Sequence, residues 1–215
     1  NMNDWMRVID EVAKESAVKR MTIFNTELDI NLKEEEVPEM TETRSSVYGK
    51  DLSILMADGK IPILVEKCIA EIEKRGIEEV GIYRIPGSAV AVNKLRAAFN
   101  KNADAVDLSG DEYRDINIVS GAFKLFFRSL PEPVTTFALY DEFINAARIE
   151  DKDERVLAIK EVISKLPKRN YDLLKRLIEH LERVTDYEEY NHMYAKNLAI
   201  VFGPNLLRAR DDNYS

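Results

Sequence analysis

The sequence predicts an all-α protein built as a bundle of amphipathic helices. Apolar residues recur at positions i, i+3, i+4 and i+7 through most of the chain after residue 46, which is the spacing of a helix with one buried face. Alternation of apolar and polar residues, the pattern of a half-buried strand, is nearly absent. Proline and glycine stand near the ends of several periodic segments, where they start or stop helices.

The first 46 residues differ from the rest of the chain. Residues 4–16 place apolar side chains close to one face of a helix, whereas residues 25–46 are polar and acidic, as in a linker. We therefore predict an N-terminal helix within residues 1–24, an acidic linker at 25–46 and one main domain at 47–215. The chain does not begin with methionine, which indicates a piece of a longer protein.

The main domain contains six periodic segments. Pro62 fits the first turn of the first segment, and Gly76 fits the position after its last turn. Ser88 is a candidate N-cap for the second segment, and Pro131 and Pro167 end the third and the fourth. In chain order the segments cover residues 61–72, 88–99, 116–130, 156–166, 174–184 and 198–202, and Gly203-Pro204 is expected to end the last one.

Composition excludes several classes of partner. The 215 residues carry 31 Lys+Arg and 39 Asp+Glu, a net charge of −8. The chain therefore lacks the positive field that would attract nucleic acids and anionic membranes. No apolar run approaches the roughly 18–20 residues that span a bilayer. The single cysteine, Cys68, excludes an internal disulfide and suits a reducing cytoplasm.

The sequence also lacks the residues of common active sites. Two histidines and one cysteine are too few for a Cys/His zinc site. Neither the phosphate-binding pattern G-x-x-x-x-G-K-[ST] nor the nucleophile pattern G-x-S-x-G occurs. We expect His180 to be a surface or partly packed residue of its helix. A self-contained hydrolase or oxidoreductase therefore finds little support.

Arg84 is unusual because it lies within a short apolar segment, G-I-Y-R-I-P-G-S at residues 81–88. Gly81 and Gly87 permit backbone conformations that are closed to other residues, so the segment between them can form a projecting turn. These residues alone leave two interpretations open, a functional guanidinium or an ordinary surface arginine.

Two further cations and an amide have equally open roles. Lys124 and Arg128 lie one turn apart on the side of a helix opposite its phenylalanine stripe. They are either solvated cations or a face for a negatively charged partner. Asn205 is expected to follow a helix end, where its amide caps the helix or braces a neighbouring loop.

The chain from about Val47 onward resembles the RhoGAP domain, the GTPase-activating domain that acts on Rho-family small GTPases. Four blocks in the family's order and at the family's spacing carry the resemblance, and together they are far more specific than any one block. The first block is residues 61–76, with Ile61-Pro62, Cys68-Ile69 and the run IEKRG at 72–76. The second is GIYRIPGS at 81–88, and the third is KLFFRSLPEP at 124–133. The fourth is NLAIVFGPNLL at 197–207, preceded by Asn191 and Met193.

This resemblance implies a RhoGAP-type helical bundle that docks on a Rho/Rac-family GTPase in its GTP-bound state and stimulates GTP hydrolysis. Arg84 matches the arginine finger, the catalytic residue that the family inserts in trans. Lys124, Arg128 and Asn205 match residues of the GTPase-binding face, and Asn197 matches an asparagine expected to be mainly structural. GTP and Mg²⁺ are carried by the partner, so the resemblance implies no cofactor and no metal for this chain itself.

The resemblance also implies a cytoplasmic protein that reaches membranes only indirectly, through neighbouring domains or the lipidated GTPase. Residues 4–16, with Trp5, resemble the closing helix of a pleckstrin-homology domain. Two features depart from the family pattern. Pro86 stands where many members have serine and fixes its own φ, which stiffens the turn. The chain also ends soon after Arg208, where the family continues through a further helical segment.

The sequence favours a GTPase activator that supplies an arginine in trans, rather than an enzyme with its own complete active site. The alternative is a non-catalytic binder of GTP-loaded small GTPases, a scaffold or an effector. Binders of this kind typically lack the finger arginine, and Arg84 is present here. Activity on a GTPase outside the Rho family is a third hypothesis.

Overall fold

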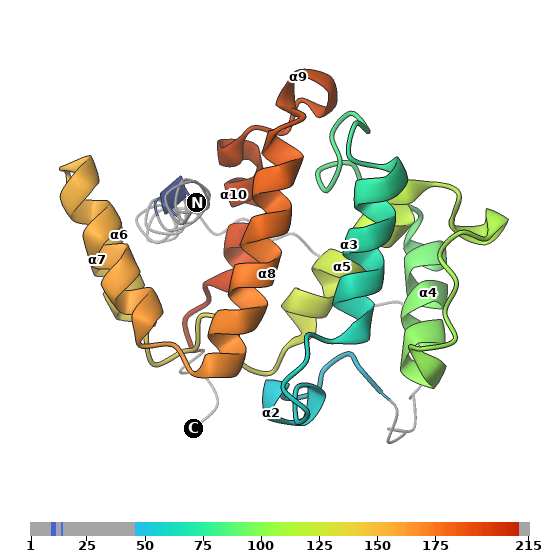
Figure 1. The fold of residues 1–215 in the computed structure, drawn as a ribbon, viewed down its shortest axis with the longest axis horizontal. Helices are drawn as coiled ribbons and strands as arrows, with labels where there is room; N and C mark the ends of the chain where they lie inside the picture. Colours follow the sequence, from blue (N-terminus) through green and yellow to red (C-terminus); the bar gives the residue numbers. More distant parts are fainter. Residues whose placement is uncertain (1–9, 12–13, 15–45, 211–215) are drawn as a thin grey trace, which may run out of the picture.

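The computed structural model describes residues 46–210 together with Asp10, Glu11 and Lys14. All three of these N-terminal residues are in helical conformation, while the rest of the predicted helix at 1–24 and nearly all of the linker lie outside the described residues. Within the described ranges every regular element is a helix, as Figure 1 shows, and the prediction of an all-α fold is confirmed.

The helices follow one another with connections of varied length. In chain order they are α2 (Leu52–Leu55), α3 (Ile63–Arg75), α4 (Ala89–Asn102), the 3₁₀ helix η1 (Asp111–Tyr113), α5 (Ile116–Ser129), α6 (Tyr140–Ala147), α7 (Lys152–Ser164), α8 (Lys168–Thr185), α9 (Glu188–Asn191) and α10 (Ala195–Leu206). None of these described helices combines the length and apolar character that a membrane span requires.

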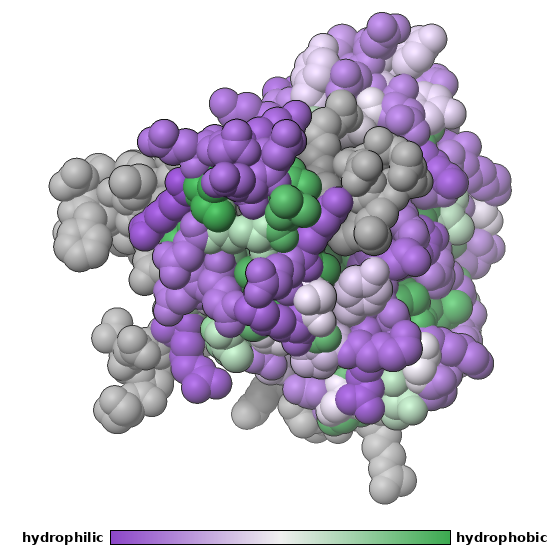
Figure 2. Space-filling model, turned by 60° about the vertical axis from the view of Figure 1, so that its left-hand side comes forward, coloured by the Kyte–Doolittle hydropathy of each residue, from purple (hydrophilic) through white to green (hydrophobic). Residues whose placement is uncertain are grey.

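Helix α5 is the centre of the bundle. It packs against α3, α4 and α10, and α8 packs against α10, whereas α6 and α7 form a hairpin at one side (Figure 1). The reason lies in the α5 sequence, INIVSGAFKLFFRS, because a helix that is apolar around most of its circumference must be covered on several sides. Viewed from the side of α6 and α7, the surface is mostly hydrophilic with small separate hydrophobic patches (Figure 2).

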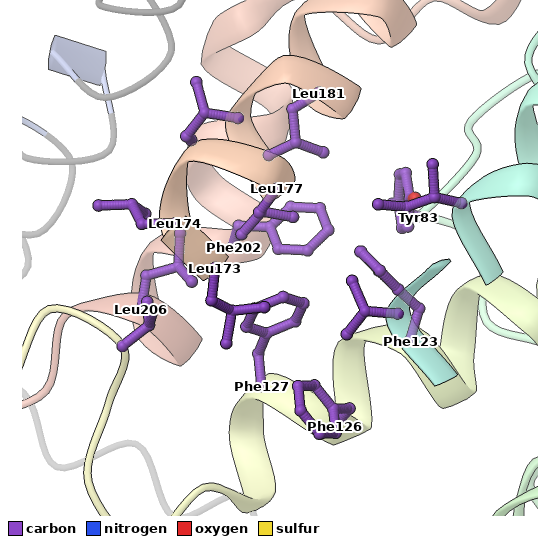
Figure 3. Close-up of a cluster of buried hydrophobic side chains, with 14 of the residues drawn as sticks. Tyr83, Phe123, Phe126, Phe127, Leu173, Leu174, Leu177, Leu181, Phe202 and Leu206 are labelled. Atoms are coloured by element: carbon purple, nitrogen blue, oxygen red, sulfur yellow. The ribbon is translucent and has the colours of Figure 1, made fainter. Parts of the chain in front are cut away.

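Aromatic rings from three elements meet in the core (Figure 3). Phe123 and Phe127 of α5 contact each other with ring centroids 5.2 Å apart, and Phe126 lies 5.3 Å from Phe127. Tyr83, from the loop between α3 and α4, lies 5.8 Å from Phe123 and 5.0 Å from Phe202 of α10. All of these pairs except the tilted Tyr83–Phe123 pair are edge-to-face, an arrangement that adds stability beyond the burial of area.

Several predicted helix ends are confirmed. Gly76 is the C-cap of α3 as expected, whereas Pro62 is its N-cap, one position before the predicted first turn. The Ser88 hydroxyl accepts a hydrogen bond from the Ala91 amide at the start of α4. Helix α5 ends at Ser129, two residues before Pro131.

The predicted end of the last helix is wrong. Helix α10 does not stop at Gly203-Pro204 but continues to Leu206 with Pro204 inside it. Proline removes one backbone hydrogen bond and crowds the preceding turn. Leu198, Phe202 and Leu206 lie at i, i+4 and i+8 and are all buried, so core packing of this stripe holds the final turn in place.

The interpretation of His180 as a surface or partly packed residue is also wrong. Its side chain is fully buried in the face of α8 that carries Leu177, Leu181 and Val184. His180 is three residues after Leu177 and four before Val184, so the apolar periodicity itself places it on the buried side of the helix.

We predict that Phe127→Ala lowers the free energy of unfolding by about 3–5 kcal/mol, because it leaves a cavity among the aromatic rings. Urea denaturation followed by circular dichroism measures this change. Leu157→Ala on α7 is the control: Leu157 is 65% exposed, so its truncation is expected to change stability by no more than about 0.5 kcal/mol. Equal losses in both variants would contradict a core centred on α5.

Candidate functional site

The segment of residues 81–88, here called the Arg84 turn, connects α3 to α4. Gly81 begins it with φ +73°, a left-handed conformation that favours glycine. The Gly81 carbonyl accepts hydrogen bonds from the amides of Arg84 and Ile85, at 2.8 and 2.9 Å. The backbone therefore folds tightly back on itself just before Arg84.

Asn191 anchors the start of this turn to the rest of the bundle. Its side chain is fully buried, and its amide nitrogen donates to the carbonyls of Ile77 and Val184, at 2.8 and 2.9 Å. The Asn191 side-chain oxygen accepts from the Met193 amide at 2.7 Å, and its backbone carbonyl accepts from the Gly81 amide at 2.7 Å. Asn191, the last residue of α9, thus ties the loop after α3 to the end of α8 and to the connection before α10.

The side chains of Tyr83 and Arg84 point in opposite directions, one into the core and the other to the surface. Tyr83 has φ +69° and a fully buried ring, whereas Arg84 is exposed. A left-handed conformation is rare for a bulky residue and is stable only where the surroundings fix it. The position of Arg84 on the surface therefore depends on how Tyr83 is held below it.

The Arg84 guanidinium lies close over its own turn. Its Nη2 atom is 3.3 Å from the point that a Cβ on Gly81 would occupy, and the Ile85 side chain is 2.9 Å from the same point. Gly81 is therefore favoured for its backbone torsion, and a Cβ there would also push aside the ends of the Ile85 and Arg84 side chains.

Gly87 has a different role from the predicted one. Its φ is not in the left-handed region, so the expectation of an unusual torsion holds for Gly81 alone. A Cβ on Gly87 would lie only 2.6 Å from the Asn117 carbonyl carbon and from the Ile118 nitrogen of α5. The absence of a side chain lets the end of the Arg84 turn rest directly on the first turn of α5.

Lys124 joins the Arg84 turn to α5. Its ammonium group donates a hydrogen bond to the Tyr83 carbonyl, and its stem is half-buried. Burial lowers the pKa of Lys124 below its ordinary value. The structure therefore places this cation as a tether of the turn, one peptide away from Arg84.

Arg128 and Asn205 are less directly connected to the turn. Arg128 follows Lys124 by one turn of α5 and is exposed, and it forms no ion pair with any described residue. Asn205 lies inside α10 rather than after its end, and its amide donates to the Val201 carbonyl of the same helix at 3.3 Å. It braces no neighbouring loop in the described part of the chain. Packing of α10 against α5 is what relates Asn205 to Lys124 and Arg128.

Two polar residues beneath the turn were not predicted as part of the site. The Tyr83 hydroxyl lies 2.5 Å from Nε2 of His180, and Nδ1 of His180 lies 2.9 Å from a Glu73 carboxylate oxygen. The signal that could have identified them is the position of His180 on the buried stripe of α8. It gave no indication of which polar partner the imidazole would meet.

These features define a class of protein: an all-helical domain that presents an arginine on a constrained turn, next to a second cation on its central helix. Comparison with known proteins identifies the family. The model of the RhoGAP domain family matches residues 62–211, and this chain belongs to that family.

The most similar relatives include beta-chimaerin of Rattus norvegicus, which is 43% identical over 169 residues, 78% of this chain and 57% of that protein. Rho GTPase-activating protein 21-A of Xenopus laevis is 43% identical over 153 residues, 71% of this chain and 8% of that protein. Among solved structures, the crystal structure of human Rho GTPase activating protein 15 superimposes with a TM-score of 0.74 at 35% identity, covering 79% of this chain and 81% of that one. This chain thus spans little more than half the length of the chimaerin.

We predict that Gly87→Ala destabilises the domain, because the new methyl group would overlap the backbone of α5 and backbone cannot rotate away. Overpacking of this kind costs about 1–3 kcal/mol. Gly110→Ala is the matched control: nothing lies within 3.9 Å of its added Cβ, and its φ of −66° suits alanine. Thermal unfolding of both variants tests this, and a melting temperature of Gly87→Ala equal to that of Gly110→Ala would contradict the described contact.

Proposed function

We propose that this chain stimulates GTP hydrolysis by a GTP-bound Rho/Rac-family small GTPase, and that Arg84 enters the partner's active site in trans. The observation that carries the proposal is the contrast between neighbours: Tyr83 is fully buried and Arg84 is exposed on the same tight turn. Family membership supports the partner class, since the relatives named above include Rho GTPase-activating proteins.

The proposed role of Arg84 is electrostatic. In GTP hydrolysis, negative charge develops on the phosphate oxygens and on the leaving oxygen, and a guanidinium can bridge two of them with its planar fork. In known pairs of GTPase and activator, such an arginine accelerates hydrolysis by roughly 10³–10⁵-fold. This acceleration corresponds to about 4–7 kcal/mol of barrier.

This division of labour makes the chain an activator rather than a complete enzyme. The partner would carry GTP, Mg²⁺ and the group that orients the attacking water, and this chain would supply Arg84 alone. The Arg84 turn suits that task because its backbone is already fixed by the hydrogen bonds to Gly81 and Asn191. A finger ordered in advance loses less entropy on docking.

The neighbouring polar residues have distinct proposed roles. Lys124 holds the Arg84 turn through the Tyr83 carbonyl, so its effect on turnover would be indirect. Arg128 is an exposed cation on the same face of α5 and would contact acidic or carbonyl groups of the GTPase. Asn205, half-buried on α10, would form a polar edge of the same interface.

The decisive experiment measures single-turnover GTP hydrolysis by a panel of GTP-loaded Rho-family GTPases, with the activator at saturation. We expect Arg84→Ala to lower the stimulated rate by about 10³-fold or more while affinity for the GTP-loaded partner is retained. Arg84→Lys is expected to stay close to Arg84→Ala, because an ammonium group cannot bridge two oxygens.

The same experiment separates the alternative. If the wild-type chain binds a GTP-loaded GTPase without accelerating hydrolysis, the chain is a scaffold or an effector and the proposal is wrong. If stimulation is observed but is unchanged in Arg84→Ala, the activator role stands and the assignment of the finger fails.

We further predict that Arg128→Glu weakens binding to the GTP-loaded partner by at least about tenfold, the equivalent of roughly 1.4 kcal/mol, and leaves the rate at saturation nearly unchanged. Lys152→Glu is the matched control, because it makes the same change of charge at an exposed position at the start of α7. Fluorescence polarisation of the loaded GTPase measures both affinities. Equal weakening by the two variants would indicate a general charge effect and no specific contact at Arg128.

A further inference from the structure

Three hydrogen-bonded side chains, two fully buried and one partly buried, connect the base of the Arg84 turn to α8 and α3. The Tyr83 hydroxyl lies 2.5 Å from Nε2 of His180, and Nδ1 of His180 lies 2.9 Å from Oε1 of Glu73. The other Glu73 oxygen accepts a hydrogen bond from Arg183 at 2.6 Å. Tyr83 and His180 are both fully buried, so water does not compete for the hydrogen bond between them.

The direction of each hydrogen bond follows from the chemistry of the groups. Burial raises the pKa of Tyr83, so its hydroxyl keeps its proton and donates. The hydrogen bond from His180 lowers the pKa of Glu73, so this group is a carboxylate and only accepts. The neutral imidazole therefore donates from Nδ1 to Glu73 and accepts at Nε2 from Tyr83. Each of these three side chains has its hydrogen-bond partner in this arrangement.

This chain of hydrogen bonds acts on the residue that precedes Arg84. Tyr83 has a left-handed backbone, which is unfavourable for a non-glycine residue and persists only when its surroundings fix it. His180 fixes the hydroxyl end of Tyr83, and Lys124 fixes its carbonyl. The next side chain along the backbone is Arg84, so loosening Tyr83 changes where the guanidinium lies.

We propose that Tyr83, His180 and Glu73 form a hydrogen-bonded relay beneath the Arg84 turn that positions Arg84, and that Tyr83 and His180 are positioning residues for stimulated GTP hydrolysis. This inference rests on the proposed function, because it assigns to the relay the placement of the proposed finger. Tyr83 and His180 lie fully buried beneath the turn and would not touch a docked partner. The effect of the relay belongs to the rate at saturation and not to affinity.

The first test is a double-variant cycle of Tyr83→Phe with Arg84→Ala, read as the single-turnover rate at saturation with a GTP-loaded Rho-family GTPase. We expect Tyr83→Phe to lower the rate roughly 3- to 10-fold, the worth of one buried hydrogen bond, with affinity unchanged. In the Arg84→Ala background the same change is expected to have no further effect. A wild-type rate for Tyr83→Phe, or an equal loss in both backgrounds, would overturn the inference.

Tyr48→Phe is the matched control. Tyr48 is also a buried tyrosine, and its hydroxyl donates to the Ala122 carbonyl of α5 at 3.1 Å, away from the Arg84 turn. It loses the same atom and a similar amount of stability, so it reports what a merely structural loss does to the rate. We expect its rate at saturation to equal that of the wild type. A loss as large as that of Tyr83→Phe would refute a specific positioning role.

A second measurement does not depend on GTPase stimulation. Hydrogen exchange of the Arg84 and Ile85 amides reports on the turn directly, because both donate to the Gly81 carbonyl. We expect Tyr83→Phe to accelerate their exchange several-fold and Tyr48→Phe to leave it unchanged. Unchanged exchange in Tyr83→Phe overturns the relay. Faster exchange without any Arg84-dependent stimulation would support the relay and refute the proposed function instead.

Substitution of His180 provides an independent test of the relay. His180→Phe leaves the Tyr83 hydroxyl buried without an acceptor and is expected to lower the rate at least as much as Tyr83→Phe. Adding Tyr83→Phe to His180→Phe removes the unpaired hydroxyl, so part of the lost stability is expected to return while the rate stays low. A double variant whose rate returns to the wild-type value would show that the hydrogen bond itself has no positioning role.

The relay also predicts a pH dependence. Burial lowers the pKa of His180 below its ordinary value of 6.5, against the opposing effect of Glu73 on α3 and with a small contribution from Arg176 and Arg183 on α8. The buried Cys68 thiol, whose pKa burial raises, stays neutral beside Tyr83. Below about pH 6.5 the unfolded chain therefore binds a proton at this histidine before the folded chain does.

The contribution of His180 to stability is accordingly complete above pH 6.5 and is lost as the pH falls below that value towards the lowered pKa. Glu73, whose pKa is lowered from 4.5, adds a further loss below that pH. We expect the free energy of unfolding to fall between pH 7.5 and 5.5 by more in the wild type than in His180→Phe, as measured by urea denaturation. Equal falls would contradict a neutral, buried His180.

Discussion

The burial of Tyr83 in a left-handed backbone conformation is the constraint on which the site depends. The ring fills a space between Phe123 of α5 and Phe202 of α10, so the core determines where this residue lies. Once Tyr83 is fixed inward, the next residue of so tight a turn emerges at the surface. The exposed guanidinium of Arg84 is thus a consequence of core packing and of the hydrogen bonds that hold the turn.

Helix α5 unites the core and the candidate site in a single element. Its apolar side chains form the centre of the bundle, while Lys124 and Arg128 occupy the part of its surface that the other helices leave open. Gly87 rests on its first turn, and Lys124 reaches the carbonyl of Tyr83. A displacement of α5 would therefore alter the core and the Arg84 turn together.

Much of the fold could be predicted from the sequence, because amphipathic periodicity and helix caps are local properties. The cap at Ser88 and the ends at Pro62 and Gly76 follow from residue chemistry alone. The continuation of α10 through Pro204 could not be predicted in this way, because packing of a stripe of buried side chains outweighs the lost hydrogen bond. Short helices such as α6 and α9 are too brief for periodicity to identify.

Four blocks of residues in a characteristic order were enough to identify the family and to single out Arg84. How that arginine is held depends on contacts between residues far apart in the chain, which the blocks do not show. Gly81 and Arg84 are neighbours in the sequence, but His180 reaches Tyr83 from 97 residues away. Local chemistry fixes which residues can form a turn, and the contacts between distant helices fix the conformation in which that turn presents its side chain.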